Sequence, residues 1–82
     1  MKLPIIKHLQ KNNSAEKMQH TIDVLESLTE HRSVKEEEMD VVGELVTNLA
    51  GAIEMNKLVE EGMSEKDAAN TFAKRVLGSI DQ

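Results

Sequence analysis

The sequence has no cysteine, tryptophan or tyrosine, and it has one proline and one phenylalanine in 82 residues. A chain without cysteine has no disulfide, no thiolate nucleophile and no cysteine-based zinc site. No apolar run approaches the roughly 20 residues that a membrane-spanning helix needs. The opening segment 1–8 is interrupted by Lys7 before it reaches the apolar length of a signal peptide. The sequence therefore predicts a cytoplasmic protein with an aliphatic core.

Positive charge is also scarce, with 10 basic against 15 acidic residues and a formal net charge of −5. The basic residues form no run longer than Lys74-Arg75, so a surface that follows nucleic-acid phosphates is not expected. The length allows one domain, 1–82, because there is no room for a second core. A chain this short hides only about 60 to 65% of its unfolded surface, which favours association with a partner.

Three segments have the spacing of amphipathic helices, in which residues i, i+3, i+4 and i+7 share an apolar face. These segments are 15–31, 34–61 and 65–78. Pro4 suits the first turn of a further short helix, and an extended arm at this end is the alternative. The predicted fold class is all-α: a small helical bundle of three main helices, with a long central helix and a short N-terminal helix or arm.

Capping residues predict where these helices begin and end. Ser14 and Ser64 are expected N-caps, and Ser33 with Glu36 has the spacing of a capping box. Gly62 and Gly78 are expected to end the second and third helices, because glycine readily adopts the left-handed conformation of a helix stop.

The long helix is expected to be covered only in part by the rest of the chain. Its apolar residues span an arc of about 180°, wider than the stripe of an ordinary surface helix. Gly43 borders this arc near Ala50, where small residues let another helix approach closely. Gly51 lies on the polar side, and the sequence offers no packing reason for it.

This excess of apolar surface predicts a homodimer that forms through the long helix. The predicted interface follows a heptad-like spacing and consists of Met39, Val42, Gly43, Val46, Leu49 and Ile53. The alternative is a monomer in which the segment Leu3–Leu9 folds back over the exposed side of the long helix.

No set of catalytic residues is recognisable, because serines, histidines and acids fall largely at helix caps or on polar faces. We therefore expect no enzyme, no resident cofactor and no metal site, and a non-enzymatic interaction or accessory role with a further protein as a possible partner. Glu16, His20 and Asp23 share one helix face, and they define the alternative of a small ligand- or metal-binding protein. A single helix supplies too few ligands, so a solvated polar face explains these residues as well.

A third alternative, a DNA-associated regulator, rests on Gly62–Ala68, which has the Gly-x-Ser-x-x-x-Ala order common in helix-turn-helix proteins. A recognition helix should then follow a short turn after Phe72. The apolar periodicity instead continues to Leu77, and only Lys74 and Arg75 are placed to meet phosphate.

Three stretches along the chain carry a resemblance to a known family. They are Lys2-Leu3-Pro4 with Ile6-Lys7-His8-Leu9, then Gly43-Glu44-Leu45, and finally Asn70-Thr71-Phe72 with the run from Lys74 to Asp81. In these stretches the chain resembles a family of uncharacterised short helical bacterial proteins of similar length, chiefly from Bacteroidetes. The resemblance covers nearly the whole chain and implies a complete protein. Because the family is a domain of unknown function, it implies no activity, ligand or site residue.

Overall fold

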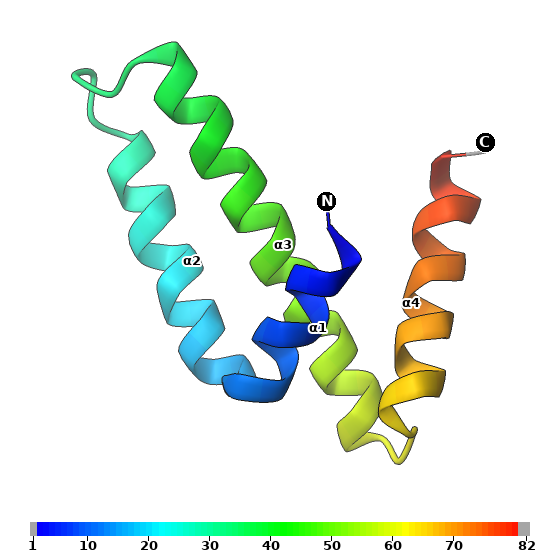
Figure 1. Cartoon of the computed structure of the whole chain (residues 1–82). Helices are drawn as coiled ribbons and strands as arrows, with labels where there is room; N and C mark the ends of the chain where they lie inside the picture. Colours follow the sequence, from blue (N-terminus) through cyan, green and yellow to red (C-terminus); the bar gives the residue numbers. More distant parts are fainter. Residues whose placement is uncertain (1, 81–82) are drawn as a thin grey trace.

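The computed structural model describes the backbone of residues 2–80 and the side chains of residues 2–76. Within this range there are four helices and no strand: α1 (Leu3–Asn12), α2 (Ala15–Thr29), α3 (Glu36–Glu60) and α4 (Glu65–Ile80) (Figure 1). The predicted all-α class is confirmed. The N-terminal segment is a regular helix packed into the core, so the expectation of three main helices is too low by one.

The long helix α3 lies at the centre, and each of the other three helices packs against it. α2 and α3 form an antiparallel hairpin, and α1 crosses α3 between α2 and α4 in the view of Figure 1. α3 has 25 residues and α1 has 10, which correspond to about 38 Å and 15 Å at the rise of an α-helix. α1 is thus too short to cover more than part of one side of α3.

The hydrophobic core is built from all four helices around the C-terminal half of α3. Its buried members are Ile6, Met18, Ala52, Met55, Ala69 and Phe72, and Leu3, Leu9, Leu49, Ile53 and Val76 pack against them. The N-terminal half of α3 has only α2 alongside it (Figure 1). The molecule therefore has a well-packed end, where four helices meet, and a two-helix end.

Three of the predicted helix boundaries are confirmed by hydrogen bonds. The Lys17 amide donates to Ser14 Oγ and the Asp67 amide to Ser64 Oγ, each at 3.1 Å. Gly62 has φ +109. The Met63 amide donates to the Leu58 carbonyl at 3.2 Å, which is the long bond of a Schellman stop.

Three other predicted boundaries are wrong, two of them around the connection between α2 and α3. No capping box forms at Ser33; α3 begins at Glu36, with Lys35 as its N-cap, and only the glutamate half of a box is present there, in which Glu38 Oε1 accepts from the Lys35 amide at 2.9 Å. Three consecutive glutamates allow either register, and a tight turn at residues 31–34 excludes the earlier one. α2 also ends early, at Thr29, because the next two amides bond to carbonyls three residues back.

Gly78 does not end the last helix, because α4 runs on to Ile80. Glycine permits a left-handed residue without imposing one.

The two glycines of α3 differ in their surroundings. A Cβ added at Gly43 would meet no atom within 4 Å, so within the described residues no helix packs closely there, and its place in a homodimer interface stays a prediction. A Cβ added at Gly51 would lie 2.9 Å from Phe72 Cζ and 3.1 Å from Ile6 Cδ1. Gly51 is the place where α1 and α4 both come close to α3. The absence of a side chain at this position lets the core close.

Candidate functional site

The structure divides the predicted interface residues between the interior and the surface. Val42 is buried, and Leu49 and Ile53 pack against the hydrophobic core. Met39 is 39% exposed, and Gly43 is exposed with open space beside it. Val46, between these groups, is partly buried. About half of the predicted interface residues are thus used in the fold of the single chain.

Exposed apolar side chains concentrate at the two-helix end. Among the described residues, the large ones are Ile5, Val24, Leu28, Met39, Val41 and Leu45. All but Ile5 lie in the second half of α2 or the first half of α3. Val24 and Val41 are more than half exposed, at 69% and 57%. An isolated exposed apolar residue is ordinary, whereas several on neighbouring helices indicate a binding surface.

The shortness of α1 explains why these side chains are uncovered. Val41, Leu45, Asn48 and Ala52 follow one side of α3 at helical spacing. The Lys2 amide donates to Asn48 Oδ1 at 3.1 Å, and Ala52 is fully buried, so α1 covers this side from Asn48 onward. Val41 and Leu45 continue the same stripe beyond the start of α1.

α2 also carries exposed apolar side chains. Met18 is buried in the core together with Ile6 of α1, and Leu25, seven residues further on, lies on the same side and is partly buried. Val24 and Leu28, four residues apart, are 69% and 49% exposed. We call the surface formed by Val24, Leu28, Val41 and Leu45 the apolar shelf.

The negative charge of the chain surrounds this shelf. Residues 24–45 contain seven acids and two bases, a net charge of −5, and all other residues together contain eight acids and eight bases. The seven acids are Glu26, Glu30, Glu36, Glu37, Glu38, Asp40 and Glu44. Both ion pairs found among the described residues lie elsewhere. The shelf is therefore an apolar surface in a strongly negative field.

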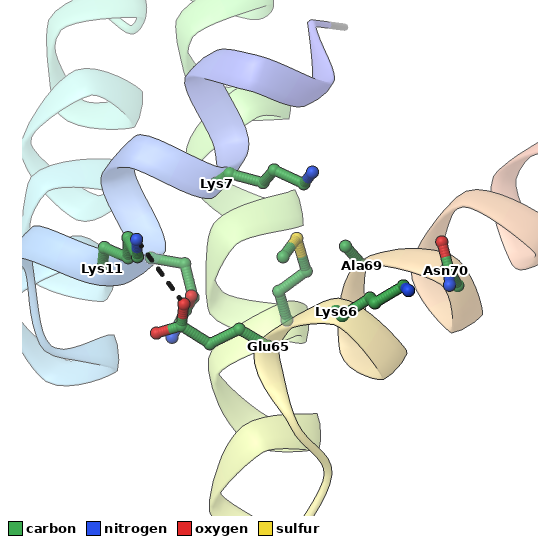
Figure 2. A pocket seen from close by; sticks show the side chains of 8 residues that line it. Lys7, Lys11, Glu65, Lys66, Ala69 and Asn70 are labelled. Carbon is green, nitrogen blue, oxygen red and sulfur yellow. Dashed lines mark ion pairs between the residues drawn. The ribbon is translucent and has the colours of Figure 1, made fainter.

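A second candidate site is a cleft of about 250 Å³ between α1 and α4 (Figure 2). Its lining combines three lysines with amide and apolar groups: Lys7, Gln10, Lys11, Met55, Glu65, Lys66, Ala69 and Asn70. Lys11 Nζ and Glu65 Oε2 form an ion pair at 3.7 Å across it. Sequence reasoning missed this cleft, since its lysines belong to separate helices.

The other candidate residues do not assemble into a site. Within the described residues there is no group of three histidine or acidic side chains that could hold a metal ion. Asp23 Oδ1 instead accepts from Gln19 Nε2 at 3.1 Å, and His20 lines a shallow, open depression. The unbroken course of α4 from Glu65 to Ile80 leaves no turn near Phe72 for a recognition helix to follow. In the described part of the chain, no helix combines the length and apolar character of a membrane span.

In its described residues the chain is a small protein of four helices. It has an apolar shelf with acidic residues around it at the two-helix end, and a lysine-lined cleft between α1 and α4. A model of a family of unknown function (DUF6952) matches residues 1–81. The chain belongs to this family, and the predicted resemblance to a family of unknown function over nearly the whole chain is confirmed. No curated protein and no solved structure shows a significant match.

Proposed function

We propose that the protein is a non-enzymatic interaction module that binds a basic amphipathic helix of another protein on the apolar shelf. The observation that carries the proposal is the coincidence of exposed apolar side chains with the entire net charge of the chain. A helix lying in a groove is held by apolar anchors at i, i+3, i+4 and i+7. Lysine or arginine on its flanks would complement the acids around the shelf and speed association.

A second copy of the chain fits this surface poorly. A twofold dimer through the shelf would bring the segments 24–45 of two chains, each of net charge −5, face to face. The juxtaposition of like charges costs several kcal/mol. A basic partner gains attraction from the same acids. The charge therefore selects a partner of opposite sign. A cytoplasmic location, expected from the sequence, is part of the proposal.

The proposal is tested with a synthetic helix of leucine and lysine, titrated calorimetrically into the protein. We expect binding that weakens as salt is raised, and a loss of at least about tenfold for the double variant Leu28→Ser/Leu45→Ser, since apolar anchors carry most of such affinity. Met39→Ser is the matched control, because Met39 is exposed on another side of α3. Equal binding by both variants, or equal binding of a leucine and glutamate helix, would contradict the proposal.

A homodimer through the long helix is a second proposal, in the region of α3 that remains accessible. Met39, Gly43 and Val46 lie on one side of α3 at helical spacing, and the open space at Gly43 allows close approach. This side differs from the shelf but lies in the same acidic segment 24–45, so the dimer has to overcome the like-charge repulsion that disfavours a second copy on the shelf.

The mass of the protein in solution tests whether it forms this dimer. At tens of micromolar we expect a sedimentation mass near twice 9.2 kDa that falls on dilution. Gly43→Arg should return the mass to that of one chain, because its side chain would stand in the interface without disturbing the fold. A mass of 9.2 kDa for the unaltered protein would rule the dimer out.

A further inference from the structure

The cleft between α1 and α4 has the charge of an anion site in a protein that is otherwise acidic. Three lysines and one glutamate line it. Lys7 reaches out from α1 on the side that faces α4, and Lys66 comes from the first turn of α4 (Figure 2). Among the described residues neither lysine forms an ion pair. Lys11 and Glu65 neutralise each other, and two ammonium groups remain for a ligand.

Gln10 is the observation that points to a ligand. The residue is only 8% exposed, lines the cleft and makes no hydrogen bond to the described residues. Among the described residues no fully enclosed side-chain polar atom lacks a partner, so the amide atoms of Gln10 keep their remaining exposure, and they keep it toward the cleft that the residue lines. Water in the cleft can bond this amide, and a ligand oxygen can take the place of that water.

The remaining lining limits what such a ligand can be. Met55 and Ala69 are almost fully buried and give the cleft an apolar side, while Asn70 adds an amide at its α4 edge (Figure 2). A volume of about 250 Å³ is below that of sites for drug-sized molecules. We propose that the cleft binds a small organic anion, a carboxylate or phosphate monoester with a short alkyl body, between Lys7, Gln10 and Lys66.

The test uses butyl phosphate, butyrate, inorganic phosphate and uncharged butanol, each titrated to the order of 10 mM, the range of weak small-ligand binding, with detection by NMR. We expect butyl phosphate or butyrate to shift the side-chain amide resonance of Gln10 in a saturable way, and butanol to leave it unmoved. Whichever of butyl phosphate and butyrate saturates the shift at the lower concentration shows whether the cleft prefers a phosphate or a carboxylate. Saturation by inorganic phosphate at the same concentration as butyl phosphate would overturn the alkyl part of the proposal.

Variants separate the site from general attraction to lysines. Lys7→Gln/Lys66→Gln should weaken binding at least about tenfold, as expected for the loss of charge-assisted hydrogen bonds. Lys57→Gln/Lys74→Gln, which removes the same charge from exposed positions outside the cleft, should leave binding unchanged. Gln10→Leu keeps the size of the side chain and should abolish binding while circular dichroism shows an intact fold. Equal weakening by both lysine pairs, or full binding by Gln10→Leu, would overturn the proposal.

Discussion

Replacing Ile6 by alanine is expected to lower the free energy of unfolding by about 2 to 5 kcal/mol, the usual cost of removing a large aliphatic side chain from a core. Ile6 has no exposed surface and is the one fully buried apolar residue that α1 contributes to the core. Its Cδ1 lies 3.1 Å from the position that a Cβ would take at Gly51, so on this side the backbone of α3 has no side chain that could fill the cavity. Guanidinium unfolding followed by circular dichroism measures the loss.

Ile5→Ala is the matched control, because it makes the same change one residue earlier on the same helix. Ile5 is 42% exposed and lies outside the core cluster, and substitutions at such positions usually change stability by about 0.5 kcal/mol or less. A ratio near one between the two losses would mean that α1 does not dock on α3 through Ile6. The comparison therefore also tests whether Leu3–Leu9 folds back over the long helix, the predicted alternative to a homodimer.

Local signals were sufficient for much of the fold. The caps at Ser14 and Ser64 and the stop at Gly62 each depend on hydrogen bonds between residues at most five apart, so the sequence pattern contains all the groups involved. The predictions at Ser33 and Gly78 are wrong for a related reason. Neighbouring residues offer a competing local solution at each position, a tight turn at 31–34 and continued helix through Gly78, and the residue pattern alone does not choose between them.

The burial of α3 could not be read from its own sequence. Asn48 and Asn56 are buried because groups far along the chain satisfy their amides. The Lys2 amide donates to Asn48 Oδ1, and Asn56 Nδ2 donates to the Asn13 carbonyl. A helical wheel counts such residues as polar and assigns the polar side to solvent. With three helices around α3, the polar side is also interior.

The same limit applies to the candidate sites. The arc predicted for α3 contained Val41 and Leu45, but only the length of α1 decides that these two remain uncovered while Ala52 is buried. The cleft depends on the approach of α1 to α4, which share no sequence signal. Surfaces made by one helix were therefore predictable in part, and surfaces made between helices were not.

Gly51→Val is expected to destabilise the protein by about 3 kcal/mol, toward the upper end of the cost of overpacking a core. The first added atom alone would lie 2.9 Å from Phe72 Cζ and 3.1 Å from Ile6 Cδ1. Phe72 and Ile6 are both buried in the core, so their side chains would have to leave their packed positions, or α1 and α4 would have to shift, to make room for the valine.

Gly43→Val separates this clash from any general effect of valine in α3, since a Cβ at Gly43 meets no atom within 4 Å. It should change stability by about 0.5 kcal/mol or less, because valine is slightly the better helix former. Thermal unfolding measures both variants at a concentration where the mass is that of one chain. Similar values for the two would show that Gly51 is not the close contact between α3, α1 and α4. A large loss confined to Gly51→Val would fix the positions of Ile6 and Phe72 against α3, and with them the spacing of the helices that form the cleft.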